Sequence, residues 1–159
     1  MNASTNNLPL TLRTTNSGFT LIELMVTIAV LAIIVGIAAP SISNQLANQR
    51  VKSTTATLVN ALKEAKVESV IRRQEVEFSF DDSTHSMNIE TKAVSPDEVA
   101  SYSYSSKSTI KANKSSITFS PSKRADAVIY NICDDKSSAT MQVIVTEIAN
   151  ISTILGGSC

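Results

Sequence analysis

An apolar run from Phe19 to Ala39 constrains this chain more than any other feature of its sequence. The run contains 21 residues, and Glu23 is its only charged residue. As an α-helix, a segment of this length covers about 30 Å, which matches the hydrocarbon core of a lipid bilayer. The sequence therefore predicts one membrane-spanning helix over residues 19–39.

The segment before this run, residues 1–18, is polar and has Arg13 as its only charged side chain. A secretory signal places a shorter apolar region, of about 7–15 residues, before its cleavage site. The alternative is a signal-peptidase cut between Ala38 and Ala39, but Pro40 lies so close to that bond that it would hinder cleavage. We therefore expect the apolar run to be retained and the polar leader to be removed.

The residues at this junction carry a specific resemblance. The stretch Gly18-Phe19-Thr20-Leu21-Ile22-Glu23-Leu24-Met25-Val26 is similar to the N-terminal signature of type IV pilins and of the pseudopilins of type II secretion. The resemblance implies that a prepilin peptidase cuts between Gly18 and Phe19, and that the new N-terminal Phe19 is N-methylated. It also implies a single pass through the bacterial inner membrane, with the following domain in the periplasm and later in a pilus or pseudopilus.

Glu23 is expensive within a spanning helix, at about 2.5–3.5 kcal/mol on insertion scales, so a carboxylate there is expected to be paired and functional. The next basic residue is Arg50, about 40 Å farther along a helix, which is out of reach. The N-terminal amine of Phe19 on a neighbouring subunit is the candidate partner, as the resemblance also implies for assembly with other pilin and minor pilin subunits. The alternative is that Glu23 lies near the lipid headgroups and extends to water.

The helical pattern continues over residues 40–75, because this stretch has many good helix formers and no glycine. Spacings of three and four place one set of residues on the face that should carry the globular domain, namely Val51, Thr55, Leu58, Leu62 and Ala65. Val67 and Ile71 project to nearly the opposite side. Near the predicted membrane exit, we expect Gly36 and Pro40 to interrupt the helix.

Residues 76–159 change to an alternating pattern that predicts strands. The expected strands are Val76–Phe80, Met87–Thr91, Tyr102–Ser105, Ile117–Ser120, Ala127–Cys133 and Thr140–Ile148. Because these strands follow one long helix, we expect an α+β fold in which antiparallel sheets pack on the helix. The chain resembles the subgroup of GspH, FimT and FimU, strongly over residues 18–39 and only in topology after Val76.

Cys133 and Cys159 are the two cysteines of the chain. In a periplasmic domain a disulfide between them is favoured over two free thiols. Two thiols and the distant His85 have no metal-ligand spacing, and no nucleophile or paired base can be assembled around His85. We therefore expect no metal site, no cofactor and no enzymatic activity.

Basic residues without intervening acidic ones lie between residues 107 and 124: Lys107, Lys111, Lys114, Lys123 and Arg124. If they converged on one tip, they could neutralise DNA phosphates without sequence preference. The alternative is a solvated loop, and the formal net charge of zero argues against a general polyanion binder. DNA-binding FimT proteins carry a Gly-Arg-x-Arg tail, whereas the sequence after Ile154 here has no arginine.

Three functions follow from the resemblance. The favoured one is a minor pilin that helps to initiate or cap a type IV pilus. The alternatives are a DNA-uptake pilin of the FimT type and a type II secretion pseudopilin of the GspH type.

Overall fold

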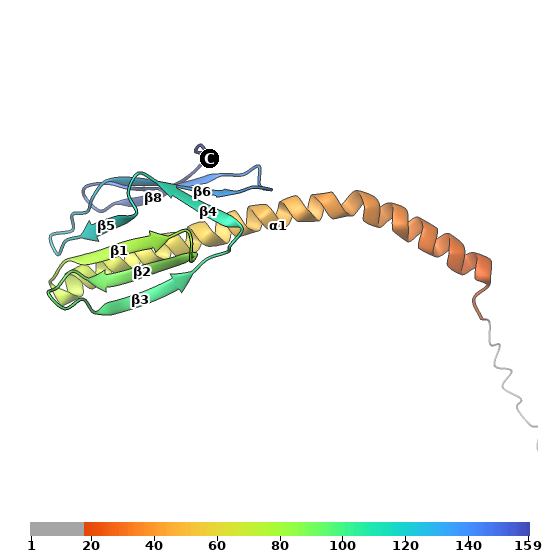
Figure 1. Cartoon of the computed structure of the whole chain (residues 1–159). Helices are drawn as coiled ribbons and strands as arrows, with labels where there is room; N and C mark the ends of the chain where they lie inside the picture. The colour runs from red at the N-terminus through yellow and green to blue at the C-terminus, as the bar shows by residue number, and fades with distance from the viewer. Residues whose placement is uncertain (1–17) are drawn as a thin grey trace, which may run out of the picture. The chain divides into compact units, whose positions relative to one another are not determined.

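The computed structural model describes residues 18–159, so the predicted leader, apart from Gly18, lies outside the described residues. Helix α1 (Leu21–Arg72) is followed by eight strands. The chain forms two compact units, with the boundary between Ala38 and Ala39. Figure 1 shows the order of these elements along the chain. The first unit holds the start of α1, and the second holds its remainder and all the strands.

Helix α1 is continuous through Gly36 and Pro40, so the expectation that these residues interrupt it is wrong. A proline within a helix removes only one backbone hydrogen bond, and the helix resumes when its other bonds remain. The helix ends at Arg72 rather than near Glu75, because Arg73 has a positive φ of 53°, the left-handed conformation that commonly terminates helices.

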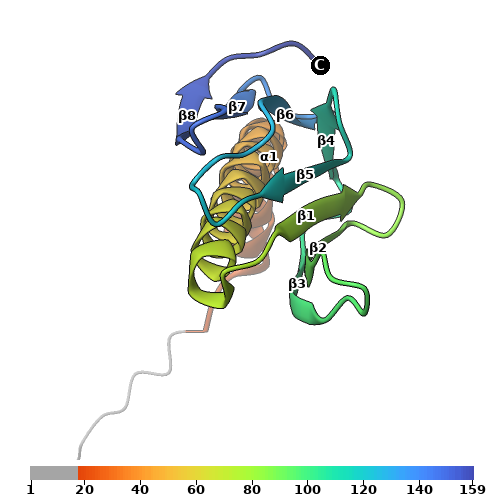
Figure 2. The ribbon, with the colours of Figure 1, turned by 90° about the vertical axis from the view of Figure 1, so that its left-hand side faces the viewer.

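Two four-stranded antiparallel sheets make up the rest of the second unit. The first sheet has the order β3 (Glu98–Ser103), β2 (Ser86–Thr91), β1 (Val76–Asp81) and β5 (Ser116–Phe119). The second has the order β4 (Ser108–Ala112), β6 (Val128–Asp134), β7 (Met141–Val145) and β8 (Ile151–Leu155). In Figure 2 the two sheets lie on different sides of the C-terminal part of α1. The predicted α+β fold with antiparallel sheets on a long helix is therefore confirmed.

The core lies where α1 and the inner faces of both sheets meet. The predicted helix face is buried, and Leu58 and Leu62 are fully enclosed. Phe78 of β1 and Tyr130 of β6 join the two sheets by an edge-to-face contact with ring centroids 6.1 Å apart. Val67 and Ile71 are exposed, as the helical spacing predicts.

Several strand boundaries differ from the predictions. The expected strand Tyr102–Ser105 is β3, which begins earlier, at Glu98, and β4 was not predicted. The expected strand Thr140–Ile148 is wrong in its length, because β7 ends at Val145 and the chain then reverses into β8. Two backbone bonds close that turn, from Thr146 N–H to Asn150 O and from Ala149 N–H to Thr146 O, and Ala149 adopts a φ of 53°.

Candidate functional site

The first turn of α1 is capped by Thr20. The N–H of Glu23 donates to Thr20 Oγ1 at 3.2 Å, and the N–H of Leu24 donates to Thr20 O at 3.2 Å. Thr20 is thus the N-cap, and Glu23 occupies the third helical position, the threonine-to-glutamate spacing of a capping box. This helix cap was not predicted, although its spacing is visible in the sequence. A carboxylate here is also favoured by the positive end of the helix dipole.

The apolar residues of the first unit surround the helix on all sides. Phe19 is 84% exposed, and the large apolar side chains from Leu21 to Ile37 are all exposed as well. By length and composition, this part of α1 is able to cross a membrane. Glu23 is exposed among these residues, and Gly18 has no other group within 4 Å of the position that a Cβ would take. The site predicted at Gly18, Phe19 and Glu23 therefore presents an apolar surface with one carboxylate.

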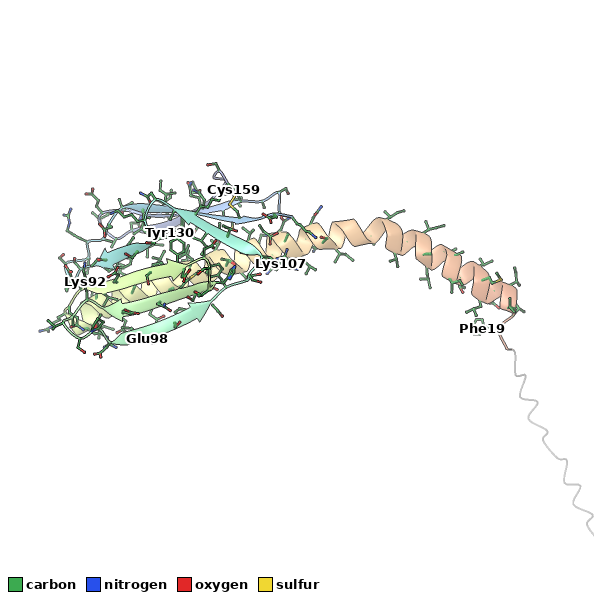
Figure 3. All side chains as sticks on the ribbon, in the orientation of Figure 1. Phe19, Lys92, Glu98, Lys107, Tyr130 and Cys159 are labelled. Atoms are coloured by element: carbon green, nitrogen blue, oxygen red, sulfur yellow. A yellow bond between two sulfur atoms is a disulfide. The ribbon has the colours of Figure 1, made fainter. Side chains whose placement is uncertain are left out.

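Among the five basic residues of the predicted DNA site, Lys107 lies apart from Arg124. Lys107 and Lys92 lie at opposite ends of the region of the strands in Figure 3, and Arg124 lines the same hollow as Lys92. Lys114 forms an ion pair with Asp126 at 3.0 Å, and its hydrogen bond holds the pKa of that carboxyl below its ordinary value.

Two more of these side chains have partners within the domain. Arg124 lies 3.7 Å from the carboxylate of Glu147, with both groups exposed to water. Lys111 donates to the backbone carbonyl of Cys159. Three of the five predicted DNA contacts are therefore already engaged with the protein itself.

The predicted disulfide is present and ties the end of the chain to β6. Cys133 and Cys159 are bonded, with their Cα atoms 6.1 Å apart. After β8 the chain turns through Gly156 and Gly157 and returns over the second sheet, where Thr140 Oγ1 donates to Gly157 O at 3.2 Å. Figure 3 shows Cys159 and its yellow bond on the outer side of this sheet. The last residues are thus held by the disulfide, by this hydrogen bond and by the bond from Lys111 to Cys159.

A groove of about 830 Å³ lies on the second sheet beside this tail. Ala112, Ile129 and Ile144 contribute apolar lining, and Lys111 and Glu147 are the charged residues along it. This lining contains no histidine, serine or cysteine. Within residues 18–159, no three histidine, cysteine or acidic side chains cluster in a way that would hold a metal ion, and His85 lies in the β1–β2 turn beside the ring of Tyr104.

Comparison with known proteins adds to this geometry. A family model described as the prokaryotic N-terminal methylation motif matches residues 13–39. The type IV minor pilin FimU of Pseudomonas aeruginosa has a similar fold, with a TM-score of 0.62 at 16% identity over 70% of this chain and 96% of that chain. The chain is pilin-like in both its N-terminal motif and its fold. No curated protein sequence gave a significant match.

A second pilin-like structure is equally relevant. The minor pseudopilin EpsH from the type II secretion system of Vibrio cholerae has a TM-score of 0.59 at 9% identity, over 69% of this pilin-like chain and 99% of that chain. Identities this low establish the shared fold alone. The likeness covers the helix-and-two-sheet architecture, and the motif covers the start of the helix.

Proposed function

We propose that this chain is a minor pilin-like subunit that helps to initiate or cap a type IV pilus. The observation that carries the proposal is the carboxylate of Glu23. It is the one charged side chain in the exposed apolar run at the start of α1, four residues after Phe19 and within the matched motif. An apolar helix with one charge near its start can span a membrane and can later pack against other helices of the same kind. The pilin-like domain on the same helix supports this reading.

In this proposal the chain enters the inner membrane with its N-terminus in the cytoplasm and its second unit in the periplasm. A prepilin peptidase cuts between Gly18 and Phe19, and Phe19 is methylated. The exposed backbone around Gly18, which has no side chain, suits access by a peptidase. The disulfide also fits an oxidising compartment.

Mass spectrometry of the mature N-terminus tests the processing step. We expect the mature chain to begin at Phe19 and to carry one added methyl group on its amine. A chain that begins at Ala39, or that retains Met1, would overturn the proposal.

Substitution of Glu23 tests the assembly step. Glu23→Gln keeps the capping-box spacing, because glutamine also serves at that position, but it removes the charge. We expect the variant to be cut after Gly18 and to be lost from the filament, as measured by its amount in sheared pili. Thr20→Ala is the matched control, since it removes the cap and keeps the charge, and we expect it to be incorporated.

If Glu23→Gln were incorporated as well as the unmodified chain, the charge would have no role in assembly. The carboxylate would then act only through the helix cap or by extending to the headgroups, and loss of incorporation in Thr20→Ala would identify the cap.

A second candidate is a pseudopilin of type II secretion, which the likeness to EpsH favours. Deletion of the chain would then stop the release of secreted proteins and leave surface pili in normal number. A minor pilin of a type IV pilus predicts the reverse. The DNA-uptake alternative is weakened because acidic side chains lie beside two of the basic residues, Asp126 beside Lys114 and Glu147 beside Arg124.

A further inference from the structure

Strand β8 is an edge strand of the second sheet, and the edge that faces away from β7 is free. It pairs with β7 in an antiparallel register in which Gln142 lies opposite Ile154. The bonds from Gly156 N–H to Thr140 O and from Thr146 N–H to Asn150 O mark the hydrogen-bonded pairs at the two ends of this ladder. In an antiparallel ladder, residue pairs that exchange backbone hydrogen bonds alternate with pairs that do not. The backbone groups of Ser152 and Ile154 therefore bond to β7, whereas those of residues 151, 153 and 155 point away from β7, toward the free edge.

Two other edge strands are closed by carboxylates. On β4, the outward N–H of Ile110 donates to Asp82 Oδ1 at 3.1 Å. On β5, the N–H of Thr118 donates to Asp126 Oδ2 at 3.3 Å. An incoming strand would have to displace these charged groups. Natural proteins use charges of this kind to prevent pairing at sheet edges.

The third edge, β3, is irregular. Its pairing with β2 shifts register between Ile89 and Glu90, and Glu98 adds a charge at its start. A register shift twists the edge and leaves a residue unpaired, which hinders the addition of another strand. Three of the four edges within residues 18–159 therefore carry a feature that opposes pairing.

The edge of β8 carries none of these features. Residues 148–159 contain no charged residue and no proline, and the register with β7 is regular. Within the described chain, the outward backbone groups of residues 151, 153 and 155 have no hydrogen-bond partner. Beside them, Ile148 and Leu155 are 71% and 77% exposed. A regular, uncharged and partly apolar edge is a template for an added strand.

We propose that β8 is the docking strand for an extended, uncharged segment of a neighbouring filament subunit, which adds to the second sheet as its fifth strand. The proposal rests on the function proposed above. The occupant is extended because it must meet backbone groups at alternate residues, and it is uncharged because the edge offers no charge to pair with.

The neighbouring segment is one other than β8 itself. Pairing of β8 with β8 would use the same surface on both subunits, which requires a two-fold axis between them. Neighbours in an open filament meet through two different surfaces. A five-residue edge offers few contacts by itself. Subunits already held side by side by their N-terminal helices would pair with it at high effective concentration.

The proposal is tested by replacing Ser152 with a photo-crosslinking residue in the full chain, expressed in the bacterium that produces this protein. Ser152 is exposed on β8, and its backbone bonds to β7, so the probe leaves the free edge open. We expect sheared filaments to contain a cross-link from this residue to an uncharged stretch of a different subunit that carries an N-terminal methylation motif.

Thr153→Lys places a charge on the edge and should abolish this cross-link. Ser103→Lys is the matched control on the edge of β3, and it should leave the cross-link intact. Formation of the disulfide, read by alkylation of the full chain, shows that each variant has folded. If Thr153→Lys fails to form it, Leu155→Lys replaces it, because Leu155 is 77% exposed and its backbone also faces the free edge.

Three results would overturn the proposal. The first is a chain that is present in filaments but gives no cross-link from residue 152. This result would contradict the docking of a strand on β8 but not the proposed function. The second is a cross-link to residues 151–155 of a second copy. The third is absence of the chain from filaments altogether, which would remove the proposed function as well.

Discussion

At the scale of single residues, a two-pronged ion pair of the second unit joins α1 to β6. Arg50 Nε donates to Asp134 Oδ2 at 2.8 Å, and Arg50 Nη2 donates to Asp134 Oδ1 at 3.2 Å. The Asp134 side chain is 2% exposed and follows Cys133 directly. The Arg50 guanidinium holds the pKa of the Asp134 carboxyl below its ordinary value of 3.8. This pair therefore fixes the helix beside the disulfide.

Because this pKa is lowered by folding, the ion pair contributes stability above pH 3.8 and loses it as the pH falls through the lower folded value. Asp134→Asn should lower the free energy of unfolding at pH 7. The difference between the variant and the unmodified chain should shrink as the pH falls below 3.8. Denaturant unfolding at several pH values measures this, and parallel pH profiles would show that the pair has no linkage to folding.

Gly157 is required by the path of the tail. Its φ is 113°, and a Cβ there would lie 2.5 Å from Asn131 Oδ1, which accepts a hydrogen bond from Gln142 Nε2 at 2.8 Å. Gly157→Ala should destabilise the domain by about 1–3 kcal/mol, through backbone strain and loss of that hydrogen bond. Gly156→Ala is the control, because Gly156 has a φ of 111° and no atom within 4 Å of its Cβ position. Equal thermal unfolding of the two variants would exclude the contact with Asn131.

At the scale of elements, the C-terminal part of α1 has one face in the core and another in solvent. Leu62 is fully buried between the sheets, whereas Val67 is 53% exposed. Helical spacing alone identified both faces, since residues three and four apart lie on the same side of a helix. The first two strands were equally visible, because buried residues alternate with less buried ones along β1.

Leu62→Ala should cost about 2–5 kcal/mol of stability, because it leaves a cavity among close-packed side chains. Val67→Ala should change stability by less than about 0.5 kcal/mol, since this position is on the surface. Chemical denaturation of the full chain in detergent measures both. A large cost at Val67 would mean that this face of the helix packs against something within the domain.

At the scale of the whole molecule, the two sheets separate residues that are close in sequence. Lys111 belongs to β4 in the second sheet, whereas Lys114 lies two residues before β5 of the first sheet. The run of basic residues therefore crosses between sheets, and its members meet different partners, such as Asp126 and Glu147. The basic stretch is therefore interleaved with acidic side chains and does not form a purely basic surface.

The disulfide acts at the same scale. It joins residues 26 apart in sequence and holds the tail over the second sheet. On the chain-entropy model a loop of this length stabilises the folded state by about 3–4 kcal/mol. Two cysteines and the expectation of an oxidising compartment were enough to predict this bond. The contacts of Gly157 and Lys111 that accompany it could not be predicted, because they depend on where the tail crosses the sheet.

The sequence by itself determined the apolar helix with its single carboxylate, the motif at Gly18 and Phe19, the buried face of α1 and the α+β class. These features depend on local spacing and composition, which a sequence displays directly. Only the tertiary structure decided the existence of β4 and β8, the turn at Ala149 and the acidic partners of Lys114 and Arg124. Short strands exist because a neighbouring strand satisfies their backbone groups, and that neighbour is brought close only when the sheets assemble on the helix.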